Sequence, residues 1–122
     1  MTSLGADIVE ISRMEISLGR TPDFSRFVFT DVERAFCEAQ AVPERHYAAC
    51  FAAKEGFLKA VGRGVLDGVP LQEIEVVQGD RRCPTLRLGP AAVAALTSVG
   101  GKETRLSLSS TAAISVALVI VS

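Results

Sequence analysis

The sequence predicts a single α+β domain in which one long helix packs against a small, mostly antiparallel sheet. The chain has 122 residues, a length at which globular proteins usually form one domain, so the domain is expected to span residues 1–122. Hydrophobic residues make up 48% and charged residues 22% of the chain, which is enough apolar material for a core. Apolar periodicity gives the order strand, three helices, two strands, helix, two strands, which is typical of the α+β class.

Residues 4–11 are predicted as the first strand. Alternation along this segment places Asp7 on one face with Val9 and Ile11, and Glu10 on the other face. An ionised carboxylate in apolar surroundings costs several kcal/mol unless it is paired, so Asp7 needs a partner.

One short helix is predicted after the first strand, and a segment with an apolar stripe leads from it to the second helix. Residues 12–19 have apolar residues at helical spacing and are predicted to end at Gly19, a residue suited to the position after a helix. A second segment carries an apolar stripe at spacings of three and four residues, formed by Phe24, Phe27 and Val28.

The longest predicted helix lies in the middle of the chain. A capping box at residues 30–33 starts a shorter helix that ends before Pro43. Proline is favoured in the first turn of a helix, and only Gly56 interrupts the helical sequence from there to Val61. Glycine at position 62 then closes this long helix, which serves as the spine of the fold.

The second half of the chain alternates short β-rich segments with one alanine-rich helix. The predicted elements are a loop at 65–70, strands at 74–77 and 85–88 around a turn at Gly79 and Asp80, a helix at 90–99, and strands at 104–109 and 114–121.

Composition excludes several classes of function. Lys and Arg total 13 against 14 Asp and Glu, a formal charge of −1, so the broad positive field needed for nucleic-acid binding is missing. The longest apolar run, residues 112–121, is about half of the ~20 residues that cross a bilayer. We therefore expect neither a nucleic-acid nor a membrane partner.

The cysteines indicate a reducing compartment. Cys37, Cys50 and Cys83 show no CxxC spacing, and the chain has one histidine, so neither a zinc module nor a disulfide framework is indicated. We expect three buried free thiols. The N-terminus also lacks the basic and apolar regions of a signal peptide, and a cytoplasmic location is the expectation.

Two acidic residues in apolar company are the strongest candidates for chemistry. Besides Asp7, Glu55 lies in the spine helix on one stripe with Phe51 and Leu58. The two carboxylates could share Mg²⁺, which binds one or two carboxylates and completes its shell with water and phosphate oxygens. The alternatives are that Asp7 caps a backbone or pairs with an arginine, and that Glu55 pairs with Lys59 one turn later.

A glycine pair follows the spine helix. Gly62 and Gly64 come after Lys54 and Lys59, and their backbone N–H groups could hold a phosphate, but the spacing matches neither GxGxxG nor the Walker motif. A simple helix C-cap is the alternative.

Taken together, five segments resemble the holo-acyl-carrier-protein synthase family, the small 4′-phosphopantetheinyl transferases. The resemblance spans nearly the whole chain in the right order, and its most specific part is the Phe-Ala-Ala-Lys-Glu run of the spine helix. The matching segments are residues 5–11, Arg13, residues 29–30 with Glu33, residues 51–62 and residues 107–109.

The resemblance implies an enzyme that transfers the phosphopantetheine arm of coenzyme A to a serine of an apo acyl carrier protein, with Mg²⁺. Asp7 and Glu55 would hold the metal, and Lys59 would complete the catalytic group. Arg13 would contact the carrier protein, and three protomers would form a homotrimer with active sites at subunit interfaces. The choice between fatty-acid and polyketide pathways, the choice between Mg²⁺ and Mn²⁺, and the general base stay open. The residues expected to bind coenzyme A are Lys54, Lys59, Gly62, Gly64, Ser109 and Thr111.

Two departures from the family pattern affect the nucleotide end of coenzyme A. Cys50 stands where the family usually has arginine, and Ser110 where it has histidine. Each lost charged contact weakens binding by roughly 1.5–3 kcal/mol. We therefore expect weaker coenzyme A binding, unless a nearby arginine supplies the charge; the candidates are Arg20, Arg26, Arg45 and Arg63.

Two other classes of protein remain open from the sequence. The first is a non-catalytic relative that keeps the fold and the carrier-binding helix but has lost nucleotide binding. The second is an unrelated α+β domain with an accidental match.

Overall fold

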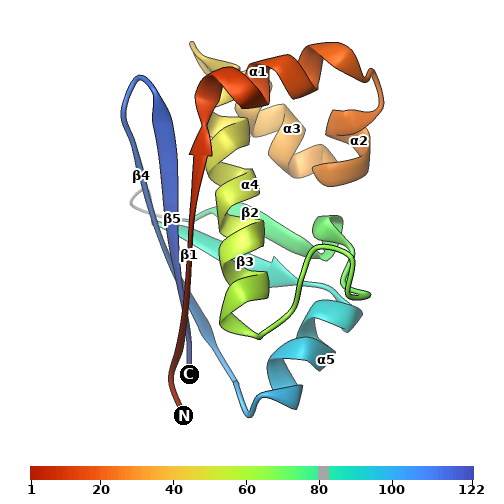
Figure 1. The fold of residues 1–122 in the computed structure, drawn as a ribbon, viewed down its shortest axis with the longest axis vertical. Coiled ribbons are helices and arrows are strands. Elements are labelled where there is room, and N and C mark those ends of the chain that lie inside the picture. Colours follow the sequence, from red (N-terminus) through yellow and green to blue (C-terminus); the bar gives the residue numbers. More distant parts are fainter. Residues whose placement is uncertain (80–82) are drawn as a thin grey trace.

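The computed structural model describes residues 1–79 and 83–122 (Figure 1). It confirms the predicted order of elements with two differences: residues 24–28 form a helix of their own, so that four helices and not three follow the first strand, and a 3₁₀ helix, η1, precedes the second strand. In chain order the elements are β1 (Ser3–Glu10), α1 (Ile11–Arg20), α2 (Phe24–Val28), α3 (Asp31–Glu38), α4 (Pro43–Ala60), η1 (Leu71–Glu73), β2 (Ile74–Gln78), β3 (Pro84–Leu88), α5 (Pro90–Ser98), β4 (Thr104–Ser110) and β5 (Ile114–Val121).

The strands form two antiparallel sheets. The larger has the order β1-β5-β4, and its register places Asp7 opposite Ala117. The smaller pairs β2 with β3. Figure 1 shows the larger sheet along one side of α4, with α1, α2 and α3 gathered at one end of the molecule and α5 at the other. The predicted α+β class and antiparallel pairing are confirmed.

Two glycines bring β1 unusually close to α4. A Cβ atom on Gly5 would overlap the carbonyl oxygen of Gly56, and a Cβ on Gly56 would lie 3.2 Å from the oxygen of Gly5. Only glycine permits such an approach of two backbones. Gly5 is two residues before Asp7 and Gly56 directly follows Glu55, so this contact holds the two acidic positions side by side.

The capping box that starts α3 is confirmed and does more than cap. Thr30 Oγ1 accepts from the backbone N–H of Glu33 at 3.2 Å, and Glu33 Oε1 accepts from the N–H of Thr30 at 2.9 Å. The fully buried ammonium of Lys54 also donates to Glu33 Oε1 at 2.8 Å, and the N–H of Val76 donates to Oε2 at 2.9 Å. One carboxylate therefore ties α3, α4 and β2 together.

The boundaries of the N-terminal elements differ from the prediction. Ile11 begins α1 instead of ending β1, and its N–H donates to the carbonyl of Ala113 at 2.9 Å. Gly19 lies inside α1, which continues to Arg20. By contrast, α4 ends as predicted, with Gly62 in the left-handed region at φ +71°.

Exposure corrects two further expectations. Phe27, placed by the pattern in an apolar stripe, is 80% exposed, whereas Val28 is buried. Cys37 and Cys50 are buried free thiols as expected, but Cys83 is exposed.

Asp80 of the predicted turn lies outside the described residues. Among the helices in the described part of the chain, none combines the length and apolar character needed to cross a membrane.

Candidate active site

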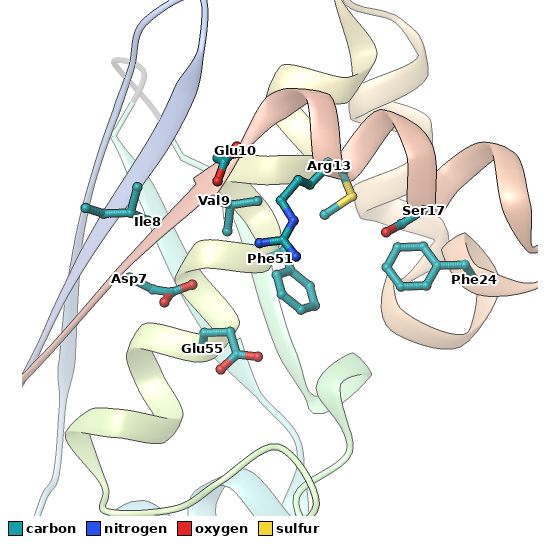
Figure 2. Close-up of a pocket in the computed structure, with 10 residues that line it drawn as sticks. Asp7, Ile8, Val9, Glu10, Arg13, Ser17, Phe24, Phe51 and Glu55 are labelled. Atoms are coloured by element: carbon teal, nitrogen blue, oxygen red, sulfur yellow. The ribbon is translucent and has the colours of Figure 1, made fainter.

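A cavity of about 500 Å³ lies between β1, α1, α2 and α4, and the two predicted acidic residues share it. Figure 2 shows the side chains of Asp7 and Glu55 pointing into it from β1 and α4. The pairing anticipated from the sequence is therefore present in the fold. Among its other lining residues are Glu10, Arg13, Ser17, Phe24 and Phe51.

Asp7 has a lysine as its partner. The ammonium of Lys59 donates to Asp7 Oδ1 at 2.9 Å and to the carbonyl of Ala6 at 3.2 Å. The Asp7 side chain is 18% exposed, whereas that of Lys59 is 53% exposed. Lys59 thus pairs with Asp7. Among residues 1–79 and 83–122, no arginine pairs with Asp7 and no ion pair joins Glu55 to Lys59.

Glu55 lies in an environment that resists its negative charge. Burial raises the pKa of the Glu55 carboxyl, the charge of Asp7 raises it further, and Lys59 lowers it only in part. Two carboxylates that repel each other across one cavity favour a bound cation.

The donor set fits Mg²⁺. Among residues 1–79 and 83–122 no group of three or more His, Cys, Asp or Glu side chains could hold a metal. Two carboxylates with room left for water and phosphate oxygens match the usual coordination of Mg²⁺, whose ligands are seldom all supplied by the protein. Asp7 and Glu55 are therefore the residues that could hold such an ion.

Arg13 and two phenylalanine rings also line the cavity. Figure 2 shows Arg13 reaching from α1 toward Phe51, with Phe24 of α2 beyond. Sequence reasoning gave neither ring a role, although Phe51 lies one turn before Glu55 and so shares its face of α4. Arg13 lines the cavity. A macromolecular partner that enters the cavity would therefore contact the positive charge of the guanidinium.

Lys54 does not reach this cavity. Its side chain is fully buried, and its ammonium donates to Glu33, to the carbonyl of Leu71 at 2.9 Å and to that of Ile74 at 2.8 Å. Three donors with three partners leave none for a ligand. The structure therefore corrects the expectation that Lys54 binds coenzyme A, and makes it a structural residue.

The glycine segment after α4 has its N–H groups occupied. Those of Gly62 and Arg63 donate to the carbonyls of Lys59 and Leu58 at 3.1 and 2.8 Å. The N–H of Gly64 donates to Asp67 Oδ2 at 2.6 Å. In this conformation the segment is a helix C-cap, the alternative that the sequence left open, and Gly62 and Gly64 offer no free donor to a phosphate.

A second cavity, of about 250 Å³, contains the positions that depart from the family pattern. Cys50, Ser109 and Ser110 line it, together with His46. Ser110 Oγ lies 2.9 Å from Ser115 Oγ, which donates to the carbonyl of Arg45. A hydrogen bond with Cys37 and burial raise the pKa of the Cys50 thiol.

Thr111 has a turn role. Its hydroxyl accepts from the N–H groups of Ala113 and Ile114 at 3.1 and 3.2 Å, which fixes the turn between β4 and β5. Of the predicted site residues, Asp7, Glu55 and Arg13 line the first cavity and Ser109 lines the second. The others line neither cavity: Lys54, Lys59, Gly62, Gly64 and Thr111.

Comparison with known proteins identifies relatives of this chain. A family model described as the 4′-phosphopantetheinyl transferase superfamily matches residues 3–117. The chain is 41% identical over 118 residues to a holo-[acyl-carrier-protein] synthase of Geobacter sp. (strain M21), covering 95% of this chain and 94% of that protein.

Solved structures extend the comparison to coenzyme A complexes. The Chronobacterium ammoniagenes ACPS–CoA complex superposes with a TM-score of 0.88 at 28% identity, covering 100% of this chain and 97% of the other. The holo-(acyl-carrier-protein) synthase of Bacillus anthracis str. Ames, solved with CoA (3′,5′-ADP), gives 0.79 at 30% identity, with coverages of 98% and 94%.

Proposed function

The chain belongs to the 4′-phosphopantetheinyl transferase superfamily, and on that premise we propose that it is a holo-[acyl-carrier-protein] synthase that modifies a serine of an apo acyl carrier protein. Coenzyme A is the donor, and adenosine 3′,5′-bisphosphate leaves when the serine oxygen displaces it at phosphorus. The observation that carries the proposal is the meeting of Asp7 and Glu55 at one cavity, with Lys59 bound to Asp7.

Each residue at the cavity has a distinct task in this reaction. Asp7 and Glu55 would hold Mg²⁺, which when bound neutralises charge on the pyrophosphate. Lys59 orients Asp7 and places a positive charge at the phosphates. The serine proton leaves to a water or a carboxylate at the same cavity.

Mass spectrometry of the carrier tests the function directly. The purified protein is mixed with coenzyme A, Mg²⁺ and an apo carrier protein, and the carrier is expected to gain the mass of phosphopantetheine. An unchanged mass across several carriers contradicts the proposal and favours the non-catalytic relative that the sequence left open.

We further propose that the protein is a homotrimer with active sites between protomers. The outer face of β1 and β5 in the larger sheet is apolar, with Leu4, Ile8 and Leu118 exposed on these adjacent strands. A contiguous apolar face of this kind marks a contact surface. Assembly on it would also offer the second cavity of one chain, with Ser109, to the carboxylates of another.

If the protein is a trimer, one charge introduced on this sheet face should dissociate it. Leu118→Asp places a carboxylate at the centre of this sheet face and is expected to change the sedimenting species from trimer to monomer at micromolar concentration. Val93→Asp, at an exposed valine of α5 that lines none of the cavities named above, is the matched control. A parent protein that already sediments as a monomer contradicts the assembly.

The nucleotide end of coenzyme A is expected to be held loosely. Cys50 is 3% exposed, so an arginine there would disturb the core. Ser110 is exposed and is the better position to restore a family contact. Ser110→His should tighten coenzyme A binding by up to about tenfold to hundredfold, the equivalent of roughly 1.5–3 kcal/mol.

Calorimetric titration with coenzyme A and with 3′-dephospho-coenzyme A checks this expectation. The parent should bind the two with similar affinity, and the variant should prefer the intact molecule. A parent that strongly prefers intact coenzyme A, with no gain in the variant, indicates instead that a relocated arginine already supplies the charge.

We also propose a cytoplasmic location. Cys37, Cys50 and Cys83 are free thiols, and unpaired cysteines are typical of proteins kept in a reducing compartment.

A further inference from the structure

A groove of about 360 Å³ lies between α2 and residues 65–70, beside but distinct from the two cavities already described. Two large apolar side chains in it face solvent: Phe27 is 80% exposed and Leu66 is 95% exposed. Exposed apolar side chains gathered at one groove mark a contact site more often than a random surface feature. Neither residue has a role in the reaction derived above.

Helix α2 connects this groove with the active-site cavity. Phe24 lines the cavity, and Phe27, three residues later on the same short helix, lines the groove. A serine on a folded protein can enter the cavity only if that protein covers the surface around its mouth. Since α2 forms part of that surface, the groove lies within reach of a docked protein substrate.

Positive charge accompanies the apolar side chains. Arg13 lines the active-site cavity and Arg26 lines the groove. In the described part of the chain no carboxylate forms a salt bridge with either guanidinium. Both cations are therefore available to acidic residues of a partner.

The groove is braced from within, so its shape does not depend on a partner. The side-chain amide of Gln72 donates to the carbonyl of Phe29 at 3.1 Å and also to that of Arg26. In the segment that carries Leu66, the Arg63 guanidinium donates to the carbonyl of Asp67, the residue after Leu66, at 3.3 Å. A preformed groove loses little conformational entropy on binding.

We propose that Phe27 and Leu66 form an apolar anchor for the carrier protein, which docks with an apolar side chain in this groove and acidic residues against Arg26 and Arg13. The proposal rests on the function proposed above and adds the kind of surface that a carrier substrate must present. A carrier with acidic residues alone at its docking face would be a poor substrate.

Steady-state kinetics with the complete protein separate docking from chemistry. Phe27→Asp and Leu66→Asp should each raise the KM for the apo carrier at least about tenfold, as expected for anchors of an interface. The kcat at saturating carrier and the affinity for coenzyme A, measured by calorimetry, should stay within about twofold. Phe27→Leu should keep most of the parental KM, and Val93→Asp on α5 is the matched control.

The possible outcomes are distinct. If the parent transfers phosphopantetheine and both aspartate variants keep its KM for the carrier, the anchor is overturned while the proposed function stands. If the variants change the sedimenting mass, the groove is a contact between copies of this chain, which also overturns the anchor. If the parent transfers nothing to any carrier, the proposed function fails and the anchor fails with it.

Discussion

Replacing Asp7 or Glu55 by alanine is expected to abolish phosphopantetheine transfer, lowering kcat by about a thousandfold or more. The two carboxylates share one cavity, and among the described residues no group of three or more His, Cys, Asp or Glu side chains could hold a metal without them. A metal centre that neutralises phosphate charge contributes several kcal/mol to the transition state, and each 1.36 kcal/mol is a factor of ten. The mass-gain assay at saturating Mg²⁺ gives the rate.

The fold should survive these substitutions. The Asp7–Lys59 pair involves a half-exposed lysine, and such pairs contribute about 0–1 kcal/mol. The free energy of unfolding is therefore expected to change by no more than about 1 kcal/mol. Asp7→Asn and Glu55→Gln keep the side-chain volume, and Glu103→Gln, an exposed glutamate outside the site, is the control. Near-parental turnover in any of the four site variants would mean that the carboxylates do not share a metal.

Lys54→Met is expected to destabilise the protein by about 3–5 kcal/mol, a large part of the stability of a domain of this size. The substitution leaves the carboxylate of Glu33 buried without its cation, and it leaves the carbonyls of Leu71 and Ile74 without a donor. Burial already lowers the pKa of Lys54, and Glu33 offsets this effect by holding the ammonium charged.

Urea denaturation of matched variants measures this effect. Lys59→Met removes a lysine from the next turn of α4, but one whose side chain is 53% exposed, and should cost less than about 1 kcal/mol. The double variant Glu33→Gln with Lys54→Met should be more stable than the sum of the two single effects, since it leaves no unpaired charge. If Lys54→Met and Lys59→Met lowered the free energy of unfolding equally, burial of the Lys54–Glu33 pair would not be the cause of the destabilisation.

Local patterns in the sequence predicted the elements well. The capping box at Thr30 and Glu33 and the C-terminal glycine of α4 are signals read over a few residues, and both are present as expected. Gly19 was misplaced because α1 continues through it by one more residue, to Arg20. Phe27 was misplaced because helical spacing alone does not show which side of a five-residue helix faces the core.

The candidate site was predicted in part. Asp7 and Glu55 were chosen because charge is costly in apolar segments, and the structure places them together. Lys54 looked equivalent to Lys59 in the sequence, five residues apart on one helix, yet one is fully buried and the other half exposed. No local pattern distinguishes them, because burial depends on what packs against each side of α4.

The sequence by itself determined the α+β class, the long helix, and the pair of acidic residues, since each depends on short-range periodicity or on the cost of burying charge. The tertiary structure alone decided that Gly5 meets Gly56, that Glu33 accepts from Lys54 while it still caps α3, and that Phe27 and Leu66 share an exposed groove. These contacts join residues tens of positions apart in the chain. Their geometry follows from how closely β1, α2 and α3 pack around the rest of the fold, a property that no window of the sequence contains.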